Sequence, residues 1–294
     1  MGLSSELKRI NPEEMGLHTI TKDELARLKQ VLLEMTSYIK MVCEKNQIEW
    51  GLCGGSALGA IRHKGFIPWD DDIDICMTRE NFNKFKGVFN NGQDNQYELL
   101  IPGDEEYYYH FPRVINKGTV LTNIQSCGRG TGVFIDIFIV EDMYDNSMMK
   151  KLHGLECSWY LFVISCLATH LRKANYYLYG TPEVIKKVRI RDFFSAFFRF
   201  RSIESWIKKA DSVFSRANNP DSEYVCVPSG VKHYFGEIYK REDMCRFQVM
   251  PFEDREFPVY SGVHNIMRQR YGEDYMKLPP EEKREVHTCI EIKL

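Results

Sequence analysis

The chain has 294 residues, of which 44% are hydrophobic and 27% are charged, values typical of a folded globular protein. Lys and Arg number 39 against 41 Asp and Glu, and a net charge so close to zero leaves no basic excess for a nucleic-acid partner. The nine cysteines are scattered, without a C-x-x-C pair. This spacing excludes a disulfide scaffold and a zinc knuckle, and it indicates a reduced protein of the cytoplasm.

Up to about residue 145, helical and strand patterns alternate along the chain. Thr21 and Glu24 form a capping box, which predicts a helix from there to Lys45 with one apolar face. Strands are expected at 48–53, 72–77, 97–101, 110–115, 119–123 and 133–140, and further helices at 56–63 and 79–89. This alternation predicts an α+β core built around a mixed sheet.

After Asn146 the pattern changes, because long helical periodicities replace the short strands. Helices are expected at 148–179, 182–201, 203–218 and 261–271. The most apolar stretch, 155–171, contains Glu156 and His170 and is too short and too polar to be predicted as a transmembrane helix. We therefore expect two parts: a core of residues 1–145, and a mainly helical region of residues 146–294 packed on it.

The segment Asp72-Ile73-Asp74-Ile75 alternates polar and apolar residues, which is the period of a strand with one buried face. Asp72 and Asp74 then lie side by side, and two carboxylates so placed repel each other unless a cation lies between them. Carboxylate oxygens are the ligands that Mg²⁺ prefers, and they also suit Mn²⁺. We predict that Asp72 and Asp74 are metal ligands and catalytic residues.

A third carboxylate is expected from a neighbouring strand. Within 132–138, Asp136 is the one acidic residue in a run of apolar β-formers, where an unpaired Asp is costly to bury. Phosphoryl transfer commonly uses metal ions that clamp the attacking and leaving oxygens. Asp136 is therefore predicted to complete the metal and catalytic set, with Asp70 as a weaker candidate.

Gly54, Gly55 and Ser56 stand between a predicted strand and a short helix. Glycines let a backbone approach phosphate closely, and a helix N-terminus offers unpaired N–H groups, so these three residues are predicted to bind donor phosphates. A P-loop is excluded, because residues 60–61 are Ala-Ile where Lys and Ser/Thr are required. The order of strand, Gly-Gly-Ser turn, helix, Asp-x-Asp strand and Asp strand is that of a nucleotidyltransferase (polymerase-β-like) core.

Three basic residues are predicted to neutralise donor phosphates. Arg62 and Lys64 lie between the glycine turn and the Asp strand, and Arg113 lies on a strand expected beside it. His110, close to Arg113 in the sequence, either reaches the same site or is structural, and both interpretations stay open.

The stretch 54–74, from Gly-Gly-Ser to Asp-Asp-Asp-Ile-Asp, resembles the signature of the LicD family nearly residue for residue. Phe-Ile-Asp-Ile-Phe at 134–138 is similar to a second motif of that family. Phe252-Glu253 and the later Arg-Gln-Arg-Tyr-Gly-Glu-Asp-Tyr-Met, which leads to Pro280, are similar to a third motif of that family. The resemblance covers roughly residues 25 to 280. The family includes bacterial phosphocholine transferases, with fukutin and fukutin-related protein as more distant relatives.

The resemblance implies a Mg²⁺-dependent transferase that moves a phosphorylated alcohol, phosphocholine above all, from a CDP-activated donor to a sugar hydroxyl and releases CMP. The acceptor would be a cell-surface glycan or its lipid-linked precursor, on the side formed by residues 146–294. By motif position, Asp72, Asp74 and Asp136 would hold the metal. Two alternatives stay open: a nucleotidyltransferase that attaches NMP to an acceptor, and a catalytically silent glycan-binding protein.

Aromatic residues raise two further hypotheses. The tyrosines at 107–109, with Trp69 and Trp159, are candidates for a cage around a quaternary ammonium group, since such cations bind over ring faces. In 193–201, aromatic residues are interleaved with Arg199 and Arg201. This pattern fits either a helix packed on the core or peripheral contact with the inner face of a membrane.

Overall fold

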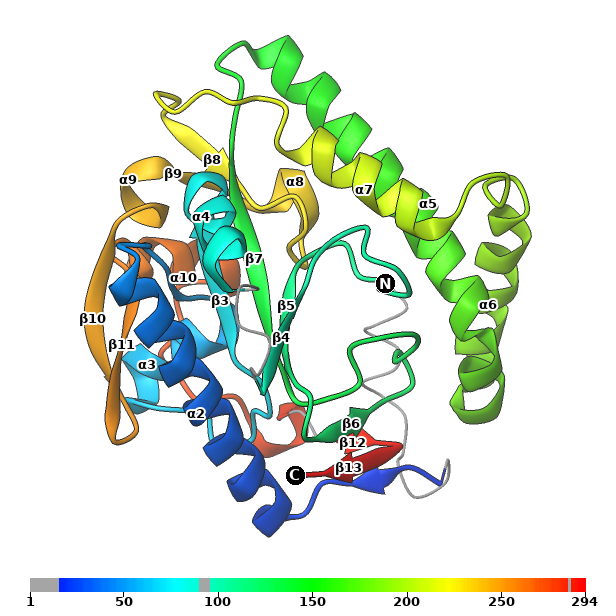
Figure 1. Cartoon of the computed structure of the whole chain (residues 1–294), viewed down its shortest axis with the longest axis horizontal. Coiled ribbons are helices and arrows are strands. Elements are labelled where there is room, and N and C mark those ends of the chain that lie inside the picture. Colours follow the sequence, from blue (N-terminus) through cyan, green and yellow to red (C-terminus); the bar gives the residue numbers. More distant parts are fainter. Residues whose placement is uncertain (1–15, 90–95, 285–286) are drawn as a thin grey trace.

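The computed structural model describes residues 16–89, 96–284 and 287–294. Nine strands within these residues form one mixed sheet in the order β10-β11-β2-β3-β7-β5-β4, with β8 pairing with the end of β7 and β9 with β8 (Figure 1). The pairs β3–β7 and β11–β2 are parallel and the others antiparallel. The strands are β2 (Gly51–Leu52), β3 (Asp74–Thr78), β4 (Tyr97–Leu100), β5 (Arg113–Asn116), β7 (Phe134–Asp142), β8 (Tyr224–Cys226), β9 (Ile238–Lys240), β10 (Phe247–Phe252) and β11 (Arg255–Tyr260).

Helices α2 and α4 lie on one face of this sheet, in front of β3 and β7 in Figure 1. The capping box that begins α2 is present: the Glu24 N–H donates to Thr21 Oγ1 at 3.2 Å, and the Thr21 N–H donates to Glu24 Oε2 at 2.8 Å. The apolar stripe of α2 packs into the main core together with β3 and β7. The helices are α2 (Lys22–Lys45), α3 (Gly54–His63), α4 (Arg79–Phe89), α5 (Ser147–Tyr179), α6 (Pro182–Ser195), α7 (Ile203–Phe214), α8 (His233–Gly236), α9 (Arg241–Met244), α10 (Val263–Tyr271) and the 3₁₀ turn η2 (Glu281–Lys283).

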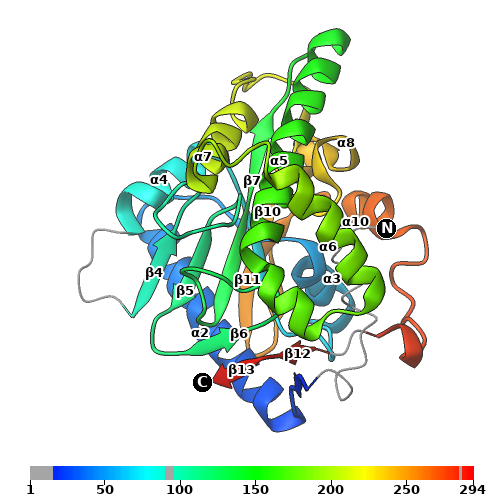
Figure 2. The ribbon, with the colours of Figure 1, turned by 90° about the vertical axis from the view of Figure 1, so that its right-hand side faces the viewer.

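Helices α5, α6 and α7 stand together at one side of the sheet (Figures 1 and 2). α5 packs along both α6 and α7, and it shares with α7 a second core that is separate from the core of the sheet. By length and composition α5 is apolar enough to cross a membrane, but 56% of its most apolar window is buried inside the protein. That degree of burial is what a core helix of a folded protein shows. Arg79 of α4 joins the two parts, because it pairs with Glu141 at the end of β7 and with Asp211 of α7.

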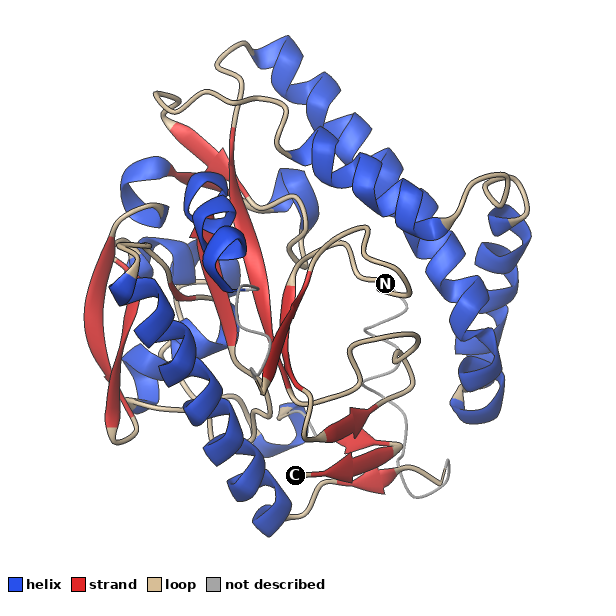
Figure 3. Cartoon of the chain, in the orientation of Figure 1, coloured by secondary structure: helices blue, strands red, loops and turns tan. Residues whose placement is uncertain are grey.

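Within residues 146–294, residues 147–214 are mainly helical, whereas residues 215–294 contain strands as well as short helices (Figure 3). β8 to β11 follow α7 and join the main sheet, so this sheet contains strands from both sides of the expected boundary at residue 145. Two short sheets, β1 (His18–Thr19) with β12 (Thr288–Cys289) and β6 (Val120–Thr122) with β13 (Glu291–Lys293), lie beside the main one. The mixed sheet and its helices confirm the α+β class.

Candidate active site

Two acidic residues and one basic residue lie side by side on the main sheet. Asp74 stands directly opposite Asp136 in the parallel pair β3–β7, and Arg113 stands opposite the same Asp136 in the antiparallel pair β5–β7. Residues opposite each other in neighbouring strands point to the same face of a sheet, with Cβ atoms about 5 Å apart. The register therefore brings the two carboxylates together, as the alternation in 72–75 and 132–138 predicts.

Asp72 was expected on the same strand, but β3 begins at Asp74 and Asp72 lies in the loop before it. It still belongs to the same group: burial raises the pKa of Asp72 well above its usual value, and Asp74, Asp70 and Asp136 raise it further. Burial likewise raises the pKa of Asp74, with contributions from Cys53 and Asp136. Crowded carboxylates of this kind ionise together only when cations neutralise them. A set of carboxylate oxygens fits a hard divalent cation such as Mg²⁺.

Asp136 is held in place by Arg113. The Arg113 Nε donates to Asp136 Oδ1 at 2.6 Å and the Nη2 donates to Oδ2 at 3.0 Å, and both side chains are buried. The guanidinium also lies over the rings of Phe134 and Tyr109, at 3.6 and 4.2 Å from their centroids. Each carboxylate oxygen keeps a second lone pair, so Asp136 retains the capacity to bind a cation. The structure thus gives Arg113 a carboxylate partner, and its contact with a donor phosphate stays a prediction.

The glycine turn places the N-terminus of α3 beside two of the carboxylates. Gly54 has a φ of +55°, and a Cβ there would lie 3.2 Å from Asp74 Oδ2, while a Cβ on Gly55 would lie 3.0 Å from Asp70 Oδ2. The N-cap residue Cys53 makes no side-chain capping hydrogen bond, and the first N–H groups of a helix are a favourable place for an anionic ligand. Ser56 is buried, and its hydroxyl accepts a hydrogen bond from the Asp74 N–H at 2.9 Å. Ser56 therefore positions the start of β3.

Arg62 and Lys64, both predicted to bind donor phosphates, lie at the other end of α3. The Arg62 Nη1 donates to the backbone carbonyls of Tyr275 and Lys277, at 2.9 and 3.4 Å, so this side chain holds the loop that follows α10. Lys64 ends α3 with a φ of 55° and has an exposed side chain. The structure assigns Arg62 a structural contact, and a role of either residue at the donor stays a prediction.

A cavity beside Asp74 contains a basic residue that the sequence reasoning did not assign. Its lining includes Gly54, Asp74, Glu237 and Arg270. Arg270 of α10 donates to Glu237 Oε2 at 2.9 Å, and its charge opposes the effect of burial on the pKa of Asp74. Arg270 belongs to the Arg-Gln-Arg-Tyr-Gly motif, but nothing in the sequence indicates that this helix lines a cavity with Asp74.

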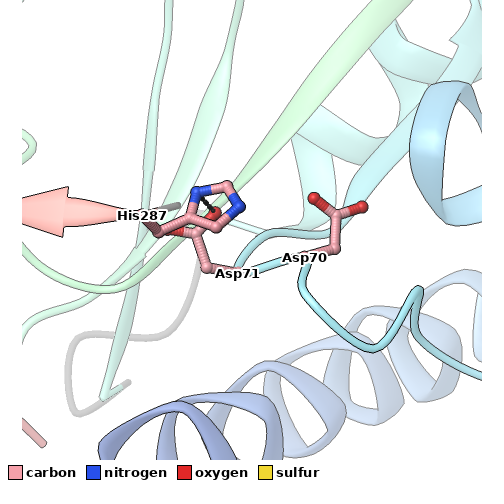
Figure 4. A group of neighbouring side chains, drawn as sticks. All are labelled: Asp70, Asp71 and His287. Atoms are coloured by element: carbon pink, nitrogen blue, oxygen red, sulfur yellow. Dashed lines mark ion pairs between the residues drawn. The ribbon is translucent and has the colours of Figure 1, made fainter. Parts of the chain in front are cut away.

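His287 was also missed, because more than 200 residues separate it from the aspartates that it meets. Figure 4 shows its ring against Asp71, with Nδ1 2.8 Å from Asp71 Oδ1, and Asp70 alongside. One ligand atom from each of these three residues lies within 4.8 Å of the others, which makes a second candidate metal site. Burial lowers the pKa of His287, but the hydrogen bond to Asp71 and the charges of Asp71, Asp70 and Asp72 together raise it above its ordinary value. This group offers a ring nitrogen with two carboxylates, whereas the group at Asp74 offers carboxylate oxygens alone, the ligands that Mg²⁺ prefers.

The aromatic cage is not assembled from the residues suggested for it. Tyr109 lies between the guanidinium groups of Arg113 and Arg172, at 4.2 and 5.0 Å from its ring centroid. Trp159 lies about 20 Å from Arg172 along α5 and is exposed. His110 has its Nε2 3.3 Å from the backbone carbonyl oxygen of Ser229, and burial lowers the pKa of its ring to about 4.

Comparison with known proteins places this site in a family. Residues 47–161 match a family described as LicD/FKTN/FKRP, nucleotidyltransferase domain. Over 272 residues the chain is 31% identical to lipopolysaccharide cholinephosphotransferase LicD of Haemophilus influenzae, which covers 89% of this chain and 94% of that protein. Over 52 residues it is 40% identical to ribitol 5-phosphate transferase FKRP of mouse and of human, which covers 18% of this chain and 10% of those proteins.

A group of acidic side chains on a mixed α+β sheet, together with these similarities, defines a phosphotransferase enzyme. The chain belongs to the LicD family. The resemblance seen in the three sequence motifs is thereby confirmed.

Proposed function

We propose that this enzyme transfers phosphocholine from CDP-choline to a sugar hydroxyl of a cell-surface glycan or of its lipid-linked precursor, and that CMP leaves. The similarity to a cholinephosphotransferase over most of both chains supports this choice. The structural observation that carries it is the register that sets Asp74 opposite Asp136. The proposed compartment is the cytoplasm, at the inner face of the membrane, in agreement with nine free cysteines. The proposed core is of nucleotidyltransferase type, with the acceptor side formed by residues after 145.

Asp72, Asp74 and Asp136 are the proposed ligands of Mg²⁺, with Mn²⁺ as an alternative. When bound, the ion supplies positive charge to the donor diphosphate and polarises it. Arg113 holds the Asp136 carboxylate in its orientation through two hydrogen bonds. Ser56 fixes the backbone at Asp74, so the carboxylate set is positioned from both neighbouring elements before a substrate arrives.

The donor diphosphate is proposed to bind between the N-terminus of α3 and Arg270. Gly54 brings the backbone close to Asp74, and Arg270 lines the same cavity. The acceptor oxygen attacks the phosphorus that carries choline, the bond from that phosphorus to the oxygen of CMP breaks, and the hydroxyl proton passes to Asp136 or water. Positive groups on the diphosphate stabilise the charge that develops on the leaving CMP.

Product analysis tests this proposal. Purified protein with Mg²⁺, CDP-choline and a lipid-linked or free glycan acceptor is expected to release one CMP for each phosphocholine added, as read by mass spectrometry. CDP-ribitol, CDP-glycerol and CDP-ethanolamine in the same assay identify the preferred head group. A nucleotide attached to the acceptor would show a nucleotidyltransferase instead. Glycan binding without turnover of any CDP-alcohol would show a silent binding protein. Asp74→Asn is the matched inactive control.

A further inference from the structure

Helix α6 has an exposed apolar stripe toward its C-terminal end. Val184, Val188 and Ser195 face inward and are buried. Ile190, Phe193, Phe194 and Phe197 recur at i, i+3, i+4 and i+7, along α6 and the turn after it, and all are exposed. The exposed fractions of Phe193 and Phe197 are 65% and 61%, and that of Phe200 is 76%. Apolar residues at helical spacing normally face the core, so this stripe needs another explanation.

The stripe continues onto α5 without a break. Phe194 contacts Phe162, with ring centroids 5.9 Å apart, and Phe162 contacts Trp159 at 6.0 Å. From Trp159 the exposed apolar residues follow one side of α5 toward its N-terminus, at spacings of three and four: Leu155, Leu152 and Met148. Figures 1 and 2 show α5 and α6 at the outer side of the molecule, away from the main sheet. A contiguous exposed apolar surface of this kind marks an interaction site.

The charge of the same region is strongly positive. Residues 147–216 contain 13 Lys and Arg against five Asp and Glu, whereas the rest of the chain contains 26 against 36. Three of the five acidic residues, Glu156, Asp192 and Asp211, are already paired with basic partners. Arg199 and Arg201 flank Phe200 and are exposed. The apolar stripe therefore lies in a basic region and ends beside two exposed arginines.

We propose that this face, formed by α5, α6 and the turn 196–201, docks on the surface of a bilayer that contains anionic lipid. Aromatic and aliphatic side chains enter the boundary between head groups and acyl chains, while arginines and lysines contact the lipid phosphates. A second copy of this chain is disfavoured as the partner, because two such basic faces repel each other. Because α5 packs against α6 and α7, we expect the bilayer to contact only the exposed side of α5, while its other side stays buried in the protein.

The docking face is connected to the site through side chains of α5. Arg172 contacts the ring of Tyr109. The same ring contacts Arg113, which pairs with Asp136. Arg172 thus links α5, one of the docking helices, to the residues that hold Asp136. That the bilayer presents the acceptor rests on the proposed function, whereas the binding itself needs neither donor nor catalysis.

Vesicle flotation of the full chain, without nucleotide, tests the proposal. The protein is expected to float with phosphatidylcholine vesicles that contain phosphatidylglycerol, and to do so weakly with phosphatidylcholine alone. The triple change Phe193→Ser, Phe197→Ser and Phe200→Ser is expected to weaken binding about tenfold or more. The control replaces three other exposed apolar residues, Met41→Ser, Val249→Ser and Leu278→Ser, and is expected to bind as the parent does.

The basic groups are tested separately. Arg199→Gln with Arg201→Gln is expected to weaken binding to the anionic vesicles by about fivefold per arginine, and added salt is expected to weaken it further. Lys84→Gln with Lys86→Gln on α4 is the control. The proposal is overturned if the parent protein does not float, if the phenylalanine variant floats equally, or if sedimentation shows a dimer that this variant abolishes. Flotation without phosphocholine transfer would overturn the proposed function alone.

Discussion

The main sheet and the three helices α5 to α7 hold their charges in opposite ways. On the sheet, Arg113 and Asp136 are buried opposite each other with Asp74 beside them. On the helices, the interior is apolar and basic residues such as Arg199 and Arg201 are exposed. Buried charges act on one another strongly, whereas exposed charges are screened by water and salt. The difference supports our two proposals, that phosphoryl transfer takes place on the sheet and that the helices attach the protein to a surface.

The largest effect is expected from a carboxylate of the sheet, and a carboxylate of the helices serves as its control. Asp74→Asn removes a proposed metal ligand and should lower kcat for CDP-choline turnover by about 10³-fold or more, because several kcal/mol of charge stabilisation is lost. Asp192→Asn on α6 removes an acidic side chain that pairs with His170 and should leave turnover nearly unchanged. Thermal melts check that both variants fold. Turnover near the parent level in Asp74→Asn would contradict the assignment of chemistry to the sheet.

The next largest effect is expected from Arg79, whose ion pairs connect the two regions. Arg79→Met leaves Glu141 buried without its partner, which should lower the free energy of unfolding by about 3 kcal/mol. Burial raises the pKa of Glu141 to about 7, so the loss should grow as the pH rises and this carboxyl ionises. Arg216→Met, which breaks the exposed pair with Glu156, should cost less than about 1 kcal/mol. Urea titrations measure the free energy of unfolding of both variants. Equal losses would show that the buried pair of Arg79 contributes no more than the exposed pair of Arg216.

Metal removal should produce a smaller effect per proton and pH unit, and its sign follows from the raised pKa values. The pKa values of Asp72 and Asp74 lie above the ordinary 3.8 in the folded protein, so the folded state binds more protons than the unfolded state above that pH. Stability in EDTA should therefore fall as the pH rises, by up to about 1.4 kcal/mol per pH unit for each such proton. Mg²⁺ should displace these protons and flatten the dependence. The same pH dependence of stability with and without Mg²⁺, measured by thermal melts, would argue against a cation at these residues.

The smallest effect concerns the helix caps. Thr21→Ala removes the capping box of α2 and should cost about 1 kcal/mol. Ser202→Ala removes a single cap contact of 3.3 Å at α7 and should cost less. Chemical denaturation measures both, and a larger loss at Ser202 would contradict this ranking.

The parts of the fold that were predictable are those with local signals. The capping box gave the start of α2, and helical periodicity gave α5 and α7. The hairpin β10–β11 was missed, because Pro251 and Pro258 lie within its strands and proline argues against a strand inside a sheet. β10 is an edge strand, which tolerates Pro251, and β11 makes one registered pair with β2.

The site, too, contains residues that local patterns predict and residues that depend on contacts across the chain. Alternation along 72–75 and 132–138 indicated that Asp74 and Asp136 share a face, because side-chain direction is a local property of a strand. The pairing of Arg113 with Asp136 depends on which strands are neighbours, and the approach of Arg270 and His287 depends on contacts across the chain. The motif residue Glu253 shows the same limit: it accepts a hydrogen bond from the Phe66 N–H at 2.9 Å and so supports the turn after α3.

The convergence of Asp72, Asp74 and Asp136 on one divalent cation is tested most directly by anomalous diffraction from crystals soaked in Mn²⁺. The expected result is an anomalous peak between Asp74 and Asp136 that disappears in Asp74→Asn crystals. A peak confined to Asp70, Asp71 and His287, or no peak near any of these carboxylates, would contradict the account.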